Sequence, residues 1–354
     1  MKTLSLLDMK QIIKSFNGVE VLHGIDFSLR AGTVHALMGE NGAGKSTLMK
    51  VLAGVHKCDA GEIWLKGKKT EIQSPRHAQE LGIAMIHQEL SPVPEMTVAE
   101  NIFLGREPRK GLFVDYKKMY TDTEKLLGEM KVRVSPRAKI GRLKVADQQL
   151  IEISKAISLN ADIIVMDEPT SAITDQEVEI LFKTIADLKK KGTGIIYISH
   201  KMDEIFRIAD DITVLRDGTY VNSWEAKDID NNTLIKNMVG RELNEIFPKI
   251  KVPAKDVVME VRHFTKENQF EDISFLVREG EILGIAGLIG AGRTELMNAI
   301  FGLEKPDSGE VFFEGKKVEI RRPSDAIRHG IAYVTEDRKN EGLVLEMGVG
   351  QNIT

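Results

Sequence analysis

Hydrophobic and polar positions follow two patterns along the chain, short apolar runs and helical spacing. Short apolar runs, which are typical of strands buried in a parallel sheet, occur at residues 33–38, 162–166 and 194–199. Hydrophobic residues at helical spacing separate the second run from the third: Val178, Leu181, Phe182 and Ile185. Strands that alternate with helices predict an α/β fold built on a mainly parallel sheet.

Local signals mark where the predicted helices begin and end. Thr174 and Glu177 form a capping-box pattern in front of the helix just described, and Gly192 follows three lysines at its other end,. A second helix is predicted after a glycine-rich loop, because three residues share one helical face: Leu48, Val51 and Leu52,.

The chain also contains an internal repeat. Residues 39–46, Gly-Glu-Asn-Gly-Ala-Gly-Lys-Ser, recur as residues 287–294, Gly-Leu-Ile-Gly-Ala-Gly-Arg-Thr, at an offset of 248 positions (287 − 39). The offset holds without a gap as far as Gly82 and Gly330. We therefore predict a first domain at 7–248, a short polar linker at 249–256, and the N-terminal part of an incomplete second domain at 257–354.

Composition and charge narrow the class of protein. The chain has 354 residues, 42% of them hydrophobic and 29% charged, a net charge of −4 and a single cysteine. These values exclude collagen-like, disordered and disulfide-built proteins and favour a reducing compartment. The acidic balance gives no support for a nucleic-acid partner, and no apolar run reaches the ~20 residues of a membrane-spanning helix. A membrane-spanning part, if one is needed, would come from another chain.

The first copy of the repeat is a phosphate-binding loop of the Walker A type, placed between a predicted strand and a predicted helix. Its glycines let the backbone curl so that N–H groups surround a phosphate, as in nucleotide-binding proteins. Lys45 would neutralise the β- and γ-phosphates, and the Ser46 hydroxyl would bind Mg²⁺. The alternative is a glycine turn with a solvated lysine. The predicted nucleotide-binding residues are Gly39, Glu40, Asn41, Gly42, Ala43, Gly44, Lys45, Ser46 and Thr47.

Acidic and polar residues follow the other predicted strands. Asp167 and Glu168 end the apolar run at 162–166, so both carboxylates would emerge at the edge where α/β sheets bind ligands,. We expect Asp167 to hold Mg²⁺ and Glu168 to orient the attacking water; two exposed acids before a turn are the alternative. His200 would bond the γ-phosphate and Glu168, whereas a lone histidine there would more often be structural. Gln88 follows the run at 83–87. It would either contact Mg²⁺ and the attacking water or be an ordinary polar residue at the end of a strand.

Phe16 precedes the turn Asn-Gly at residues 17–18. Its ring suits either stacking on adenine or packing in the core.

The order of these motifs resembles that of an ABC-type ATPase, and the chain resembles the ATP-binding subunit of bacterial sugar importers of the ribose/galactose/xylose kind. More specific matches occur at residues 85–90 (Met-Ile-His-Gln-Glu-Leu), 238–243 (Met-Val-Gly-Arg-Glu-Leu) and 333–338 (Tyr-Val-Thr-Glu-Asp-Arg). The resemblance implies a P-loop NTPase fold of ABC type with a helical subdomain, followed by an incomplete second copy. It also implies ATP and Mg²⁺ as ligands and sugar uptake driven by hydrolysis. The partners would be two permease subunits and an extracytoplasmic sugar-binding protein, with the chain at the cytoplasmic face of the membrane.

Several residues depart from the pattern of that family. Each ATP of an ABC pair lies between one Walker A loop and the signature loop Leu-Ser-Gly-Gly-Gln of the other unit. The matching segment here, 143–149, has Lys144 in place of the serine. Lysine could contact phosphate as a point charge, but it cannot reproduce a short hydroxyl contact. We favour the interpretation that Lys144 is tolerated because this signature faces the weaker site. In the second copy Arg293 replaces the lysine, and Glu336 stands at the position of Gln88. We expect nucleotide binding there to be weak or absent.

The early end of the repeat leads to a prediction about activity. A second signature loop is absent from residues 257–354, so we expect the chain to be truncated within its second ATPase domain, to bind MgATP, and to hydrolyse it slowly alone. A homodimer of two first units is possible but would put Lys144 at both sites. The alternatives are an inactive or regulatory nucleotide-binding fragment and a soluble ABC protein acting on ribosomes or DNA. The short linker, acidic balance and single cysteine argue against the second alternative.

Overall fold

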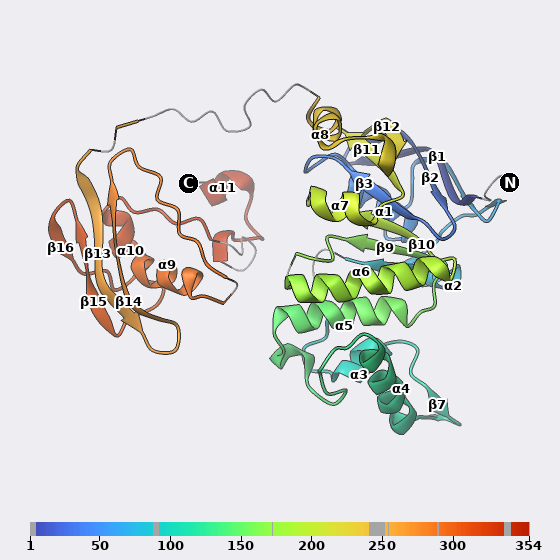
Figure 1. Cartoon of the computed structure of the whole chain (residues 1–354), viewed down its shortest axis with the longest axis horizontal. Helices are drawn as coiled ribbons and strands as arrows, with labels where there is room; N and C mark the ends of the chain where they lie inside the picture. The colour runs from blue at the N-terminus through green and yellow to red at the C-terminus, as the bar shows by residue number, and fades with distance from the viewer. Residues whose placement is uncertain are drawn as a thin grey trace. The chain divides into compact units, whose positions relative to one another are not determined.

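The computed structural model describes residues 5–87, 92–171, 173–240, 252–253, 255–288, 290–335 and 341–353. The chain forms two compact units, Met1–Asn244 and Glu245–Thr354 (Figure 1). Among the helices of the described residues, none combines the length and apolar character needed to cross a bilayer.

The first unit is built on a six-stranded sheet. In spatial order its strands are β12 (Thr219–Glu225), β11 (Asp211–Arg216), β3 (Val34–Met38), β10 (Gly194–Ile198), β9 (Ile163–Asp167) and β6 (Ile83–Ile86). Each neighbouring pair from β11 to β6 is parallel, and β12 is antiparallel to β11. Every residue of β3, β9 and β10 is buried, as expected for strands covered on both faces. The predicted mainly parallel sheet is confirmed.

A second, antiparallel sheet covers one face of the first unit. Its order is β2 (Val19–Arg30), β1 (Ser5–Phe16), β4 (Ala60–Leu65) and β5 (Lys68–Lys69). The helix α1 (Lys45–Leu52) shares a hydrophobic core with both sheets: Leu48 packs in one cluster with Ile25 of β2 and Leu37 of β3. The first turn of α1 is therefore fixed between two layers.

Helices cover the opposite face of the central sheet. Figure 1 shows α5 (Val145–Ile157) and α6 (Asp175–Lys190) side by side, and both contribute to the core that contains Ala36 of β3 and Met166 of β9. The predicted capping box at Thr174 and Glu177 is confirmed. Because neighbouring residues of a strand point to opposite faces, Ala36 and Leu37 belong to different cores.

A helical subdomain is inserted between β6 and β9, as the family resemblance implied. It comprises α3 (Val98–Ile102), the hairpin β7 (Arg109–Lys110) and β8 (Phe113–Val114), α4 (Tyr116–Glu129), a short 3₁₀ helix at Ile140–Arg142 and α5. The remaining helical segments of the first unit are α2 (Pro75–Glu80), α7 (Met202–Ile208), the 3₁₀ turn Ala226–Asp228 and α8 (Asn231–Val239).

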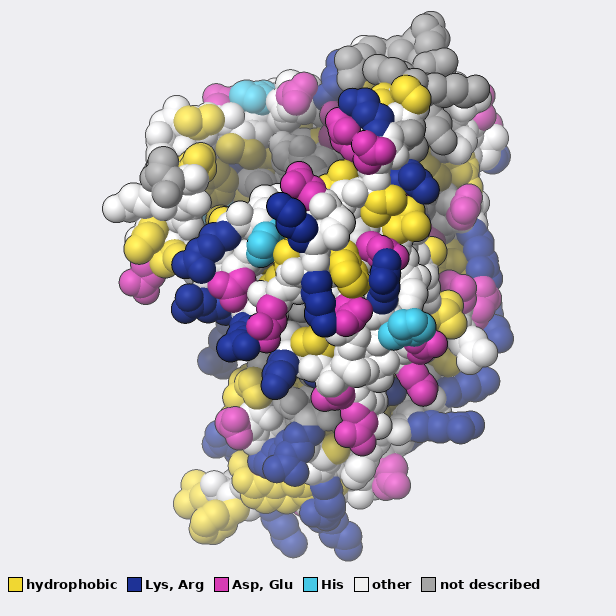
Figure 2. Space-filling view, turned by 90° about the vertical axis from the view of Figure 1, so that its left-hand side faces the viewer, with side chains coloured by type: hydrophobic (Ala, Val, Ile, Leu, Met, Phe, Trp, Pro, Cys, Tyr) yellow, Lys and Arg dark blue, Asp and Glu magenta, His cyan; other side chains and the backbone are white. Residues whose placement is uncertain are grey.

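The second unit repeats only part of this architecture. Its antiparallel sheet has the order β14 (Phe270–Arg278), β13 (Val257–Lys266), β15 (Ser308–Phe313) and β16 (Lys316–Val318). Its helices are α9 (Arg293–Phe301), α10 (Pro323–Arg328) and α11 (Val349–Ile353). A small core joins Phe264 and Val311 of the sheet to Leu296 and Ile300 of α9. Oppositely charged side chains are interspersed over the face that Figure 2 presents, and local ion pairs such as Lys317–Glu310 occur in this unit.

Candidate nucleotide site

The glycine-rich loop of the first unit connects β3 to α1. Gly39 has φ +149°, and a Cβ atom there would lie 2.2 Å from the carbonyl oxygen of Leu215. Gly44 caps α1 with φ +94°, and its Cβ would lie 2.7 Å from Leu22. Only glycine fits both positions, so the packed strands on either side impose the curled backbone that a phosphate-binding loop needs.

Lys45, the first residue of α1, folds its ammonium group against this loop. Its Nζ donates to the carbonyl oxygens of Gly39, at 2.7 Å, and Glu40, at 3.0 Å. Burial lowers the pKa of Lys45, while the charges of Asp167 and Glu168 oppose that shift. The lysine therefore stands between the loop and the two carboxylates, a position suited to a cation that binds phosphate.

Asp167 and Glu168 lie at the carboxyl end of β9. Asp167 is 4% exposed; burial raises the pKa of its carboxyl, and a hydrogen bond with Ser46 opposes this shift. The hydroxyl and the carboxylate thus meet beside the loop. A buried carboxylate whose charged form is disfavoured by desolvation would be stabilised by a metal ion, so this pair fits a Mg²⁺ ion shared with phosphate oxygens.

Glu168 and His200 meet beyond the ends of two adjacent strands. The distance from His200 Nδ1 to Glu168 Oε1 is 3.2 Å. Glu168 has φ +48°, and its backbone N–H donates to the carbonyl oxygen of Ile198 at 2.9 Å. The turn after β9 is therefore tied to the last residue of β10, which directs the Glu168 side chain toward the segment that carries His200.

The other predicted residues lie in the exposed part of the glycine loop and at the end of β1. Glu40, Asn41 and Gly42 form the exposed part of the loop. Phe16, at the end of β1, is 37% exposed and lies edge-on to His56 with ring centroids 5.0 Å apart. It is therefore not a core residue, contrary to one of the two readings of its sequence position.

Gln88 and Glu336 lie outside the described residues. Lys144 of the signature-like segment is the N-cap residue of α5.

A buried polar cluster beside the site was not predicted from the sequence. Glu204 of α7 is 8% exposed and accepts hydrogen bonds from Thr170, Tyr197 and Ser199. The available signals were the positions of Thr170 and Ser199, which flank Glu168 and His200 in the sequence. Glu204 itself resembles an ordinary acid in the first turn of a helix.

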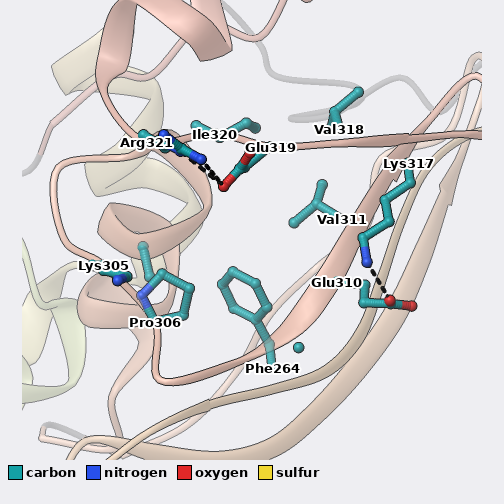
Figure 3. Close-up of a pocket in the computed structure, with 12 residues that line it drawn as sticks. Phe264, Lys305, Pro306, Glu310, Val311, Lys317, Val318, Glu319, Ile320 and Arg321 are labelled. Atoms are coloured by element: carbon teal, nitrogen blue, oxygen red, sulfur yellow. Dashed lines mark hydrogen bonds and ion pairs between the residues drawn. The ribbon is translucent and has the colours of Figure 1, made fainter.

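A large hollow of the described residues lies elsewhere. It has a volume of about 1000 Å³ and belongs to the second unit, between β15, β16 and the end of α9 (Figure 3). Apolar Phe264, Val311 and Ile320 line it, together with the ion pair Lys317–Glu310. A counterpart of about 420 Å³, with the ion pair Lys69–Glu62, occurs in the first unit. None of the nucleotide-site residues lines either hollow, so size does not identify the functional site here.

The strand–loop–helix unit, the adjacent carboxylates and the parallel sheet define a P-loop nucleotide-binding protein of the α/β class. Comparisons with known proteins agree. The sequence pattern of the ABC transporter family matches residues 22–171 and 270–352. The solved ADP conformation of an ATP-binding cassette of an ABC transporter superposes with a TM-score of 0.59 at 28% identity, covering 69% of this chain and all of that one.

Curated relatives define the family more narrowly. A putative ribose/galactose/methyl galactoside import ATP-binding protein of Rhizobium etli is 54% identical over 99% of this chain and 68% of its own length. A ribose import ATP-binding protein of Bacillus licheniformis is 51% identical over 98% of this chain and 71% of its own. A galactose/methyl galactoside import ATP-binding protein of Photobacterium profundum is also 51% identical, over 98% and 70%. The chain belongs to the ABC transporter family and, within it, to the import ATP-binding proteins that these relatives represent.

Proposed function

We propose that the chain is an ATP-hydrolysing subunit that energises uptake of a monosaccharide through separate permease subunits. The observation that carries the proposal is the convergence of Lys45, Ser46, Asp167 and Glu168 beside one glycine loop. The names of the relatives, which are import proteins for ribose and galactose, support a pentose or hexose as the cargo.

The proposed roles follow from the positions of the side chains. The backbone N–H groups of the loop and the Lys45 ammonium hold the β- and γ-phosphates. Ser46 and Asp167 would hold Mg²⁺, and the ion would supply positive charge beside the phosphates. The half-exposed ring of Phe16 stacks on adenine. Gln88, outside the described residues, would contact Mg²⁺ and the attacking water.

Glu168 and His200 are the proposed catalytic pair. Glu168 accepts a hydrogen bond from the attacking water and orients it toward the γ-phosphorus. As the new P–O bond forms, the bond to the β–γ bridging oxygen breaks, the proton of the water passes to the released phosphate, and ADP leaves with its charge balanced by Lys45. His200, 3.2 Å from Glu168, donates toward the γ-phosphate and keeps the carboxylate in line. Phosphoryl transfer depends mainly on such positioning and charge stabilisation.

The proposed partners are two permease subunits and an extracytoplasmic sugar-binding protein, with the chain at the cytoplasmic face of the membrane. Support comes from the import function that the names of the relatives state. The proposed domain limits remain 7–248 and 257–354, joined by the linker at 249–256.

The activity of this chain alone is expected to be low. A complete ABC site needs a signature loop opposite the Walker A loop, and the only signature-like segment of this sequence, residues 143–149, carries Lys144. We expect MgATP binding with turnover far below the ~10 s⁻¹ typical of enzymes. Rapid steady-state hydrolysis by the purified monomer that disappears in Lys45→Ala would contradict this expectation.

Transport is tested by uptake. A strain that carries the cognate permease and binding-protein genes, but lacks this gene, is complemented with the wild-type chain or with Lys45→Ala. ATP-dependent uptake of labelled ribose or galactose is expected with the wild type only. Nucleotide binding without complementation by either chain would favour a regulatory nucleotide-binding protein instead.

A further inference from the structure

A buried carboxylate connects the two loops that carry the proposed catalytic pair. Glu204 lies in the first turn of α7. Its Oε2 accepts hydrogen bonds from Tyr197 OH at 2.8 Å, Thr170 Oγ1 at 2.9 Å and Ser199 Oγ at 3.2 Å. Its Oε1 lies 3.1 Å from the ammonium group of Lys201. The negative charge is thus balanced by one cation and three hydroxyl donors, as a buried carboxylate requires.

The partners of Glu204 come from both sides of the proposed catalytic pair. Thr170 is two residues after Glu168, and Ser199 and Lys201 are the neighbours of His200 in the chain. Lys201 also donates to the backbone carbonyl oxygen of Thr170 at 3.2 Å. One side chain of α7 therefore holds the turn after β9 and the turn after β10 against each other.

These turns begin where the sheet ladder ends. The pairing of β9 with β10 stops at Asp167 and Ile198. The hydrogen bond from the Glu168 N–H to the Ile198 carbonyl oxygen holds the start of the first turn, but it does not involve Thr170, Ser199 or Lys201. The left-handed backbone of Glu168, with φ +48°, is a conformation that surrounding contacts must maintain. The Glu204 cluster supplies such contacts at Thr170 in the turn after β9 and at Ser199 and Lys201 in the turn after β10.

The surroundings of the cluster indicate a role beyond general packing. Tyr197 is fully buried, and Thr170 and Ser199 are 2% and 5% exposed. Loss of the carboxylate would leave buried hydroxyl groups without an acceptor. The hydrophobic core around β9 and β10 would remain, so the fold would persist while the two turns lose their common anchor.

We propose that Glu204 is a positioning residue for ATP hydrolysis, which fixes Glu168 and His200 relative to each other by holding the turns on which they stand. This inference rests on the proposed hydrolytic function. Glu204 is given no contact with nucleotide in this proposal. Its loss should therefore slow ATP cleavage without weakening ATP binding.

The test compares binding with single-turnover cleavage in the full chain. Enzyme in excess over [γ-³²P]ATP with Mg²⁺ allows a slow rate to be measured over hours, and a fluorescent ATP analogue gives the dissociation constant. Glu204→Gln is expected to slow cleavage by about tenfold to a hundredfold, the range associated with small misplacements of reacting groups. The dissociation constant should stay within about threefold of wild type, because the loop and Lys45 are untouched. Glu204→Ala should slow cleavage further, because it removes the acceptor that glutamine retains.

Glu179→Gln is the matched control. Glu179 pairs with Arg207 at 2.5 Å and thereby joins α6 to α7, and its hydrogen bonds within the described residues are with Arg207 rather than with either turn. The same chemical change at Glu179 is expected to leave both cleavage and binding within twofold of wild type. If Glu204→Gln does not fold, Tyr197→Phe removes one donor from the cluster while the carboxylate stays, and cleavage should fall several-fold.

The outcomes separate this inference from the proposed function. If MgATP binding does not depend on Lys45, the proposed function fails. If the wild type binds and cleaves ATP and Glu204→Gln cleaves within twofold of it, only the positioning role fails. Equal losses in cleavage, affinity and melting temperature would also overturn that role, because they would indicate general destabilisation. Lys45-dependent binding without cleavage over the whole time course would overturn it too, since no hydrolysis would remain for Glu204 to support.

Discussion

The same apolar pattern has two different outcomes in the two copies of the repeat. Residues 34–38 form the buried central strand β3, whereas their counterparts at 282–286 form no strand in the described part of the second unit. Val34 is fully buried, and the corresponding Ile282 is 98% exposed. Residues 83–86 and 331–334 differ in the same way: Ile86 is 1% exposed and Val334 is 93% exposed.

Neighbouring strands explain the difference. In the first unit β3 lies between β10 and β11, and β6 pairs with β9. These partners come from residues 163–216, far along the chain. Among the described residues of the second unit, no strand pairs with 282–286 or 331–334. An apolar run of strand type therefore becomes a strand only where other strands supply its hydrogen bonds and cover its faces.

The antiparallel sheets behave in the opposite way. The order β2-β1-β4-β5 in the first unit matches β14-β13-β15-β16 in the second. All four strands of each sheet lie within one stretch of the sequence, residues 5–69 or 257–318, although a longer connection that carries α1 or α9 precedes the third strand. The comparison separates elements that fold from local pairing from elements that depend on distant strands.

Four predictions test this comparison between the two copies. The largest difference is expected in nucleotide binding by the two glycine loops. Lys45→Ala is expected to weaken MgATP binding by about a thousandfold, or about 4 kcal/mol, because it removes the charge beside the phosphates. Arg293→Ala, at the matching position, should change affinity by less than twofold. Titration with a fluorescent ATP analogue measures both; a similar loss in the two variants would mean that both loops bind nucleotide.

The next difference concerns pH. His35 of β3 is buried, and its Nε2 lies 2.6 Å from Thr213 Oγ1; Leu283 is its counterpart in the second copy. Burial lowers the pKa of His35 to about 4. Since this value lies below that of the unfolded chain, the neutral ring stabilises the fold fully above pH ~6.5, and the stabilisation is lost as the pH falls toward 4.

The expected loss from His35 is about 2 kcal/mol at pH 5 and about 3 kcal/mol near pH 4. Urea unfolding followed by tryptophan fluorescence reports on the first unit alone, because Trp64 and Trp224 both lie there. His35→Leu, which copies the residue of the second unit, should remove most of this pH dependence. Equal slopes of stability against pH in the variant and the wild type would show that another group is responsible.

A smaller difference concerns burial of the two matching segments, residues 34–38 and 282–286. Val34→Ala is expected to destabilise the first unit by about 2 kcal/mol, because it leaves a space in a packed core. Ile282→Ala removes a side chain that is 98% exposed and should change stability by less than about 0.5 kcal/mol. Thermal unfolding followed by circular dichroism covers both units. A large effect at Ile282 would mean that this segment is covered in solution.

Sequence reasoning predicted the placement of side chains that local structure determines. Lys45 and Ser46 follow a glycine loop, and Asp167 and Glu168 end an apolar run, so strand ends alone bring them to one edge of a parallel sheet. The Glu204 cluster escaped prediction because its donors come from the turn after β9, from β10 and from the turn that follows. The exposure of residues 282–286 escaped it for a related reason: periodicity reports what a segment would bury, and long-range partners decide whether it does.

The smallest difference is expected where the two copies share the same backbone feature, a glycine that faces a bulge in the neighbouring strand. In β1, Gln11 has φ +49° at an irregularity of the ladder, and a Cβ atom on Gly61 of β4 would lie 2.5 Å from the Gln11 carbonyl oxygen. In β13, His263 has φ +50°, and a Cβ on Gly309 of β15 would lie 2.7 Å from the His263 carbonyl oxygen. Each glycine has a positive φ and accommodates a bulge in the neighbouring strand.

Gly61→Ala and Gly309→Ala should therefore destabilise their own sheets by similar amounts, about 2 kcal/mol each, from strain and crowding. Hydrogen exchange of peptides that cover β4 or β15 measures each sheet separately within the full chain. Faster exchange is expected only in the unit that carries the substitution. If Gly309→Ala left β15 as protected as in the wild type while Gly61→Ala exposed β4, the antiparallel sheet of the second unit would tolerate a rearranged bulge. Local pairing would then be less decisive for that sheet than its matching strand order implies.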